Sequence, residues 1–303
     1  MMSTDGGDGG GAARASVPRR LAAEIAAVAA GGLAILIVAA PALAPDHGPA
    51  FLAGSAGPWT WFMATLWRRR ADNRPAPAPP VPAAAAVAAS LGAPTLVTLA
   101  RALLVSALGG LLAAGGGSEQ LATWWPGALY AAAVVGDLAD GALARRLART
   151  TKLGASLDVT TDAAGLLVAP LLAVARGRLP PWYLLLSVAY PLFRSGLWLR
   201  ARLGLPVPLQ RLRPYPAARF AAGAQMALVT AALFPFLPRP LLWPAATVIM
   251  LPTLALFARE WRLVTSPSAP IAEAPAQPQH AGSRVGPGAE GREAPQRRQP
   301  GRR

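Results

Sequence analysis

The chain has 303 residues, of which 53% are hydrophobic and 14% charged, whereas about a quarter of a soluble domain is charged. Its apolar residues form blocks of roughly 17–25 residues, the length that crosses the hydrocarbon core of a bilayer. The net charge of +15 lies mostly between these blocks and in the tail, which favours positive-inside loops over nucleic-acid binding. Disulfides and thiolate sites are excluded because there is no cysteine, and the two histidines have no partner for metal or triad chemistry.

The N-terminal part of the chain contains a polar segment followed by two apolar runs. Residues 1–20 are rich in glycine, and we expect them to be disordered. Residues 21–67 are interpreted as a transmembrane helical hairpin with both ends on the basic, cytoplasmic side. For residues 21–44 a cleaved signal peptide ending in small residues near Ala44 is an alternative, although the run is long for a signal core.

A second apolar region follows a proline-rich linker. Residues 71–83 cannot continue a helix and mark a domain boundary. The region 90–262 contains six further spans, which predicts an all-α, polytopic transmembrane bundle with a six-helix core preceded by the hairpin. The spans are expected at about 94–114, 121–140, 155–175, 181–199, 217–236 and 239–258. Residues 266–303 are rich in Pro, Gly, Gln and Arg and are expected to form a disordered basic tail.

The charges of the loops set the expected orientation. Loops 142–152 and 200–213 are strongly basic and are expected on the cytoplasmic side. Loop 115–120 has no positive residue and is expected outside. Loop 176–179 carries two arginines on the outer side, which departs from the rule.

Four aspartates lie on two neighbouring predicted spans beside a basic loop. Asp137 and Asp140 are three residues apart and share one helix face. Gly154, Asp158 and Asp162 are spaced by four and form one stripe on the next span. Because the connecting loop is short, the two spans are antiparallel neighbours, and we expect the two pairs of carboxylates to converge.

The cost of burying these carboxylates argues for a bound cation. One carboxylate in a span costs about 2.5–3.5 kcal/mol, and four cost roughly 10 kcal/mol, comparable to the net stability of a domain. Oxygen ligands without His or Cys favour Mg²⁺ or Mn²⁺, and two such ions can clamp a pyrophosphate. The small residues Gly141, Ala144 and Gly154 would let a ligand approach the helix backbones. The competing interpretation is that the aspartates cap helix ends or pair with the arginines of the loop.

Residues 136–162, GDLADGALARRLARTTKLGASLDVTTD, resemble the signature of the CDP-alcohol phosphatidyltransferases, D-x2-D-G-x2-A-R-x8-G-x3-D-x3-D. The signature is filled without a gap by Asp137, Asp140, Gly141, Ala144, Arg145, Gly154, Asp158 and Asp162. A weaker match at 94–101, PTLVTLAR, resembles P-N-x-L-T-x-x-R with Thr95 in place of Asn. This match leaves two interpretations of Arg101 open. It could contact the site and bind a phosphate or the acceptor, or it could snorkel to the cytoplasmic edge.

The resemblance implies a membrane-embedded enzyme of phospholipid synthesis. A CDP-linked lipid, usually CDP-diacylglycerol, would enter from the bilayer, and an alcohol would displace CMP. Asp137, Asp140 and Asp158 would hold two divalent ions, Mg²⁺ or Mn²⁺. Asp162 would be a metal ligand and also the general base for the acceptor hydroxyl. The nucleotide side of the site would be formed by Gly141, Ala144, Arg145 and Gly154.

The acceptor is less well indicated by the resemblance. Arg194, Arg200 and Arg219 lie where the family carries basic residues that hold the acceptor, and for each of them a positive-inside loop role is the alternative. The family pattern is altered at Ser195, Ala218, Arg219 and Ala222. Glycerol 3-phosphate, inositol phosphate, serine and a lipid hydroxyl therefore stay open, and the three arginines favour glycerol 3-phosphate because they suit a phosphorylated acceptor.

Two other functional classes compete with this interpretation. A carboxylate-lined ion or metal transporter also buries acids, but typically near the membrane midplane. A non-catalytic relative is disfavoured by the intact signature. We expect an integral protein of a bacterial inner (cytoplasmic) membrane with the active site facing the cytoplasm and no nucleic-acid partner, and we leave a homodimer open.

Overall fold

The computed structural model describes residues 17–75, 86–115, 124–147, 151–207 and 216–266. Within these residues the chain forms eight α-helices, two short 3-10 helices and one isolated β-bridge, so the predicted all-α class is confirmed. Most of the predicted disordered N-terminus, most of the proline-rich linker and almost all of the basic tail lie outside the described residues.

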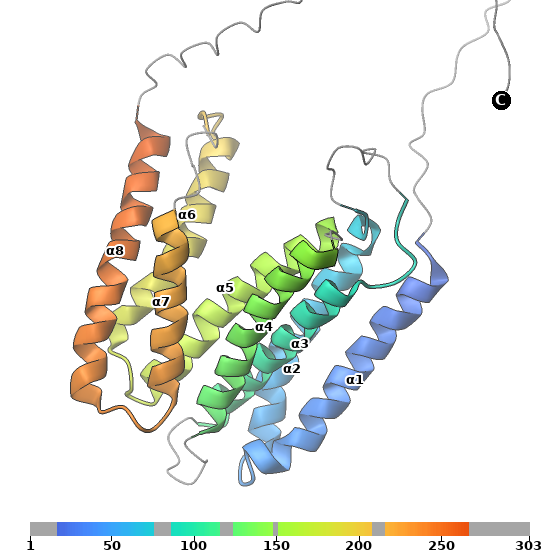
Figure 1. The fold of residues 1–303 in the computed structure, drawn as a ribbon, viewed down its shortest axis with the longest axis horizontal. Helices are drawn as coiled ribbons and strands as arrows, with labels where there is room; N and C mark the ends of the chain where they lie inside the picture. The colour runs from blue at the N-terminus through green and yellow to red at the C-terminus, as the bar shows by residue number, and fades with distance from the viewer. Residues whose placement is uncertain (1–16, 76–85, 116–123, 148–150, 208–215, 267–303) are drawn as a thin grey trace, which may run out of the picture. The chain divides into compact units, whose positions relative to one another are not determined.

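A helical hairpin precedes six further helices, as the sequence predicts (Figure 1). The hairpin consists of α1 (Arg19–Leu43) and α2 (Gly48–Arg68), followed by the 3-10 helix η1 (Arg70–Asp72). The core consists of α3 (Ala93–Ala113), α4 (Trp125–Leu147), α5 (Lys152–Ala175), α6 (Leu184–Arg202), α7 (Pro216–Leu233) and α8 (Arg239–Thr265). The 3-10 helix η2 (Pro181–Tyr183) leads into α6.

One helix boundary differs from the sequence expectation in a way that matters for the site. We expected the span that carries Asp137 and Asp140 to end near Asp140, but α4 continues to Leu147. Asp140 therefore lies about two turns inside the helix end. The charged residues at the end of α4 lower its hydropathy without interrupting the helix, because arginine and alanine are both good helix formers.

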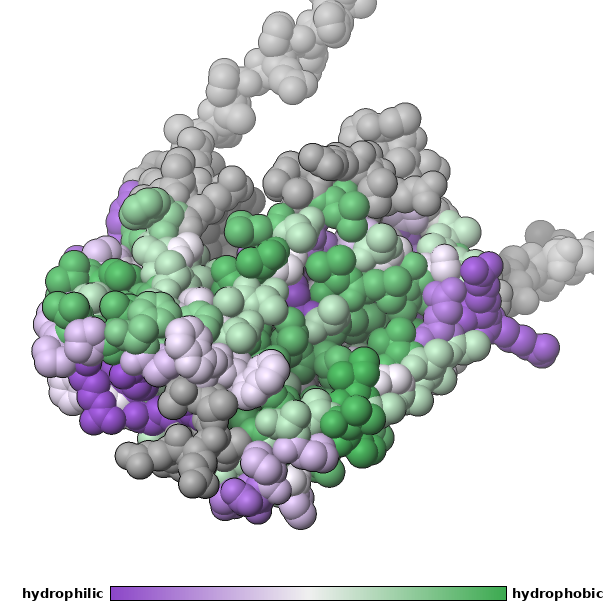
Figure 2. Space-filling model, turned by 60° about the horizontal axis from the view of Figure 1, so that its bottom comes forward, coloured by the Kyte–Doolittle hydropathy of each residue, from purple (hydrophilic) through white to green (hydrophobic). Residues whose placement is uncertain are grey.

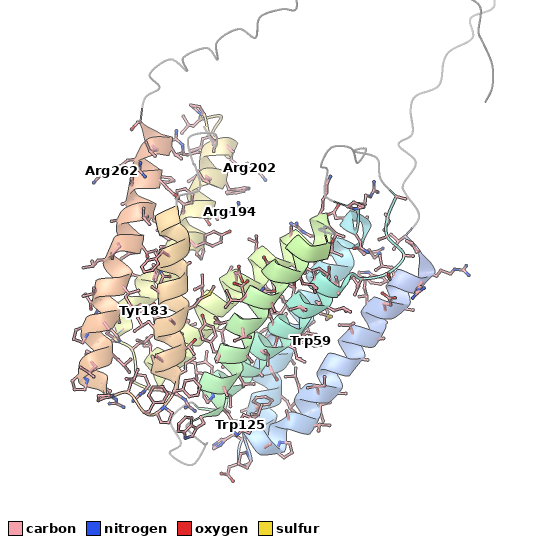
Figure 3. The ribbon with its side chains drawn as sticks, in the orientation of Figure 1. Trp59, Trp125, Tyr183, Arg194, Arg202 and Arg262 are labelled. Atoms are coloured by element: carbon pink, nitrogen blue, oxygen red, sulfur yellow. The ribbon has the colours of Figure 1, made fainter. Side chains whose placement is uncertain are left out.

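The described helices have the composition of a membrane protein. By length and composition α1, α3, α5 and α8 can each cross a membrane, and the other helices lie alongside them in one bundle (Figure 1). Figure 2 shows hydrophobic residues across the middle of the visible face, with hydrophilic residues mostly toward its margins. In Figure 3 Arg202 and Arg262 lie toward one end of the bundle and Trp125 toward the other. The chain is an integral membrane protein.

The N-terminal hairpin packs into the bundle through small residues. Trp59 of α2 donates from Nε1 to the carbonyl of Ala29 at 3.0 Å, and its ring lies against Gly32 of α1. Gly54 of α2 meets Gly109 of α3 so closely that a Cβ on Gly54 would lie 2.7 Å from the Gly109 carbonyl oxygen. Contacts between small residues are a common way for membrane helices to approach closely.

The segment after α2, residues 69–75, connects the hairpin to the start of α5. The Arg69 guanidinium donates to the Ser156 hydroxyl, and the carbonyl of Arg74 accepts from the Lys152 backbone at 3.1 Å. Asn73 is fully buried and donates from Nδ2 to the carbonyls of Ala88 and Ser90. The hairpin is therefore tied to the segment that leads into α3 and to the first turn of α5.

Arg178, one of the two arginines of loop 176–179, has a structural role. Arg178 donates to the carbonyl oxygens of Ala232, Phe234 and Leu237 at 3.0, 2.7 and 2.6 Å. Carbonyls at the end of a helix lack partners within the helix. Arg178 thus caps α7 and joins the turn after α5 to the turn before α8.

We predict that Gly54→Ala destabilises the protein. The new Cβ would lie 2.3 Å from the Cβ of Ala113, and such overpacking typically costs about 1–3 kcal/mol. The matched control is Gly31→Ala in α1, where nothing lies within 4 Å of the new Cβ. Thermal unfolding in detergent should give a lower Tm for Gly54→Ala and an unchanged or higher Tm for Gly31→Ala. Equal values for the two variants would contradict the close packing of α2 on α3.

Candidate active site

Three helices of the core, α3, α4 and α5, place charged side chains against one another. Arg101 of α3 is 4% exposed and lies beneath the carboxylates of Asp137, Asp158 and Asp162. One carboxylate oxygen from each of these aspartates lies within 4.8 Å of the others. The sequence prediction that the two pairs of aspartates converge therefore holds for Asp137, Asp158 and Asp162.

The guanidinium of Arg101 divides its hydrogen-bonding edge among the three aspartates. Its Nη1 donates to Asp158 Oδ1 at 2.6 Å. Its Nη2 donates to Asp162 Oδ1 and lies 3.0 Å from Asp137 Oδ1. The aspartate side chains keep 30–41% of their surface exposed, whereas the arginine side chain keeps 5%. The carboxylates are thus accessible from a recess, and the guanidinium of Arg101 lies beneath them.

Asp140 has a different partner in the structure. Its Oδ2 accepts a hydrogen bond from the Thr98 hydroxyl at 2.5 Å, and both residues are buried. Asp140 is not a member of the cluster of three. Thr98 and Arg101 are three residues apart on α3, so one face of this helix supplies a partner to every aspartate of the signature.

Two glycines allow the three helices to come this close. A Cβ on Gly136 of α4 would lie 2.8 Å from Cγ of Arg101, so the arginine side chain needs this position empty. A Cβ on Gly154 of α5 would lie 3.1 Å from the Thr95 hydroxyl. Gly154 also donates its backbone N–H to Thr151, the N-cap of α5, at 3.0 Å. Its small size serves helix packing, and its assignment to the nucleotide stays a prediction.

The acidic recess adjoins a larger apolar cavity. The recess is lined by Arg101, Asp137 and Asp162 together with Tyr130 and Leu166. Leu166 also lines a cavity of about 610 Å³ that is bordered mainly by apolar residues of α5, α6, α7 and α8. A ligand with a charged head in the recess could therefore place an apolar chain in the cavity.

The remaining predicted residues are placed as follows. Gly141 is half-buried in α4, and Ala144 and Arg145 continue that helix, but their side chains lie outside the described part of the structure. Arg194 is exposed on α6, and Arg200 donates to the carbonyl of Pro206 at 3.2 Å. Neither forms an ion pair with the described aspartates. Arg219 lies in α7, and its side chain is not described.

The residues present fit a divalent cation. Asp137, Asp158 and Asp162 carry three negative charges against the single positive charge of Arg101, which leaves an excess of negative charge in an apolar bundle. Carboxylate oxygens are the ligands that Mg²⁺ and Mn²⁺ prefer. Thr98 would act as an outer partner that orients Asp140, since ligating carboxylates are themselves commonly hydrogen-bonded.

Reasoning from sequence missed Thr98 and Gly136 and left Arg101 undecided. Thr98 and Arg101 both belong to the segment PTLVTLAR, which provided the available signal. Gly136 directly precedes Asp137 but lies outside the signature. Its role depends on how α3 and α4 are rotated against each other, which spacing along one chain does not reveal.

We predict that Arg101→Ala makes the stability of the protein depend on divalent cations. Removing one partner from a buried ion-pair network typically costs about 3–5 kcal/mol, because the other charges lose their compensation. The Tm in EDTA should fall well below that of the wild type, and Mg²⁺ or Mn²⁺ should restore much of the loss. Arg70→Ala is the control, because Arg70 is half-buried and contacts its own neighbour Trp67. An Arg101→Ala variant with wild-type Tm in EDTA would contradict the counter-ion role.

Comparison with known proteins assigns the core to a family. The CDP-alcohol phosphatidyltransferase family model matches residues 91–258, which include α3–α7 and most of α8. No curated protein and no solved structure matches the chain at a significant level. The match covers more than half of the chain and contains the arginine and all four aspartates described above. The chain belongs to the CDP-alcohol phosphatidyltransferase family.

Proposed function

We propose that this protein transfers a phosphatidyl group from a CDP-linked lipid, CDP-diacylglycerol, to the hydroxyl of an alcohol, with release of CMP. Membership of the family supports a transferase of phospholipid synthesis that acts on CDP-alcohols in a lipid environment. The observation that carries the proposal is the convergence of carboxylate oxygens of Asp137, Asp158 and Asp162 within 4.8 Å, beside a recess that shares Leu166 with an apolar cavity. A carboxylate cluster suits a metal-bound pyrophosphate, and the adjoining cavity suits the chains attached to it.

The metal site is proposed to use all four aspartates of the signature. Asp137 and Asp162 line the recess, and Asp158 joins them in the cluster. Thr98 hydrogen-bonds Asp140. When bound, two divalent ions, Mg²⁺ or Mn²⁺, would supply positive charge for the pyrophosphate of the donor. Gly141, Ala144, Arg145 and Gly154 are proposed to border the cytidine phosphate on the same side of α4 and α5.

Asp162 is proposed to act as the general base. Its carboxylate would accept the proton of the acceptor hydroxyl, and the resulting oxygen would bond to the lipid-linked phosphorus. The bond from this phosphorus to the bridging oxygen of the pyrophosphate would break, and CMP would leave. Arg101 hydrogen-bonds Asp162 and Asp158 and would hold both carboxylates toward the recess throughout.

The acceptor is proposed to be glycerol 3-phosphate. Arg194, Arg200 and Arg219 lie on α6 and α7, and guanidinium groups suit a phosphorylated acceptor. Figure 3 places Arg194 below Arg202 on α6, toward the end of the bundle that carries Arg262. The basic end of the bundle is proposed to face the cytoplasm of a bacterial inner membrane, with the enzyme acting as a monomer or a homodimer.

An acceptor screen with purified protein in Mn²⁺ or Mg²⁺ tests this proposal. The assay measures CMP release from CDP-diacylglycerol with glycerol 3-phosphate, inositol phosphate, serine or a lipid alcohol as the acceptor. The lipid product would be identified by mass spectrometry. Release with glycerol 3-phosphate supports the proposal in full. CMP release with another acceptor would support the transfer reaction but contradict glycerol 3-phosphate as the acceptor. Absence of CMP release with every acceptor would favour a non-catalytic relative or a metal transporter.

We predict that Asp162→Asn lowers CMP release by about 10²–10⁴-fold, the usual contribution of a general base. The protein should stay folded, because the asparagine keeps the shape of the side chain and Arg101 keeps its other two aspartates. Asp46→Asn is the matched control, since Asp46 is exposed in the turn between α1 and α2. Full turnover by Asp162→Asn would remove this residue from the base role.

A further inference from the structure

The apolar cavity beside the site is not built by the family core alone. Its lining includes Gly57, Pro58 and Trp61 of α2, in addition to residues of α5–α8. The family match begins at residue 91, so α2 lies outside it. The hairpin therefore contributes surface to a cavity that begins next to the acidic recess.

We propose that α2 forms one edge of the chamber that receives the apolar chain of the lipid-linked substrate, and that Gly57 and Trp61 set which chains are accepted. This proposal rests on the proposed function and deepens it, because it assigns a substrate-selecting role to the N-terminal hairpin.

The position of the cavity points to a chain attached to the reacting phosphate. Ala163 and Ala164, which directly follow Asp162 on α5, line the cavity. Leu166, one turn after Asp162, lines both the cavity and the acidic recess. An apolar chain joined to a phosphate in the recess would thus pass Leu166 to reach the cavity.

The chemistry of the lining favours a hydrocarbon chain. Two of its polar side chains are already hydrogen-bonded within the protein. Gln225 donates to Thr253 at 2.5 Å, and Ser187 donates to the carbonyl of Leu166 at 2.7 Å. Most of the other lining residues are alanine, leucine, valine, proline or aromatic. Burying a hydrocarbon chain against such a surface is favourable in proportion to the apolar area covered.

The edge formed by α2 is exposed and has room for a side chain. Trp61 is 51% exposed, and Gly57 is exposed. A Cβ built on Gly57 meets nothing within 4 Å. This region of the cavity can therefore be narrowed at Gly57 or widened at Trp61 without overlap with the backbone of another helix.

The edge is also held at a fixed distance from the acidic residues. Pro58 lines the cavity and lies next to Gly109 of α3, and Gly54, one turn earlier, contacts the same glycine. At the other end of α2, Arg69 donates to Ser156 of α5. Since α3 carries Arg101 and α5 carries Asp158 and Asp162, α2 is packed directly on the helices that build the site.

The test compares Gly57→Leu with the control Gly31→Leu, which places the same side chain at an exposed glycine of α1 that is equally open but does not line the cavity. CMP release would be measured with short-chain and long-chain CDP-diacylglycerol. We expect Gly57→Leu to lower the ratio of long-chain to short-chain kcat/KM by at least about tenfold, because even one methylene changes selectivity by this amount in an apolar pocket. Gly31→Leu should keep the wild-type ratio.

A second variant acts in the opposite direction. Trp61→Ala widens the edge and should raise the preference for long or branched chains, so the proposal can be tested even if Gly57→Leu folds poorly. Equal chain preference in wild type, Gly57→Leu and Trp61→Ala would overturn it.

A binding measurement separates this proposal from the proposed function. Lipids retained by each purified variant would be identified by mass spectrometry. Suppose that the wild type releases no CMP but Gly57→Leu retains less long-chain lipid than Gly31→Leu. This result would support the lipid-binding role of α2 and contradict the proposed transfer reaction. If CMP release is normal while chain preference and retained lipid are alike in all variants, the transfer reaction is supported and the proposed role of α2 is contradicted.

Discussion

The central constraint on this protein is the placement of several carboxylates inside an apolar helical bundle. Arg101 compensates part of their negative charge, because it hydrogen-bonds Asp158 and Asp162 and lies 3.0 Å from Asp137. An unpaired charge at such a position would be costly, so the mutual arrangement of α3, α4 and α5 depends on this contact. The charge that Arg101 leaves uncompensated is also what makes the site attractive to a divalent cation.

The packing of the bundle follows from bringing these groups together. Gly136 gives the Arg101 side chain room to cross toward the aspartates, and Gly154 lets the first turn of α5 approach Thr95. The N-terminal hairpin uses the same device where Gly54 meets Gly109. Small residues thus mark the places where backbone or side chains must pass closely, and larger residues fill the surrounding bundle.

Much of the site could be predicted from sequence because helical spacing is regular. Residues three and four apart share a face, and this was enough to predict that Asp137 would meet Asp158 and Asp162. The partner of Asp140 could not be predicted, because Thr98 lies on another helix and their contact depends on how α3 and α4 are rotated. Arg101 was ambiguous for the same reason, since a snorkelling arginine and an inward-facing one have the same sequence. The contribution of α2 to the cavity was also beyond sequence reasoning, because a short glycine pattern fits a lipid-facing surface equally well.

The position of Arg101 along the chain has a consequence for biosynthesis. Because synthesis proceeds from the N-terminus, the hairpin and α3 emerge from the ribosome before α4 and α5, which carry the aspartates. The hairpin can pack on α3 through Gly54 and Gly109 at that stage. Each later aspartate then meets an arginine or threonine that has already been made, so the acidic helices need not wait for a metal ion to insert.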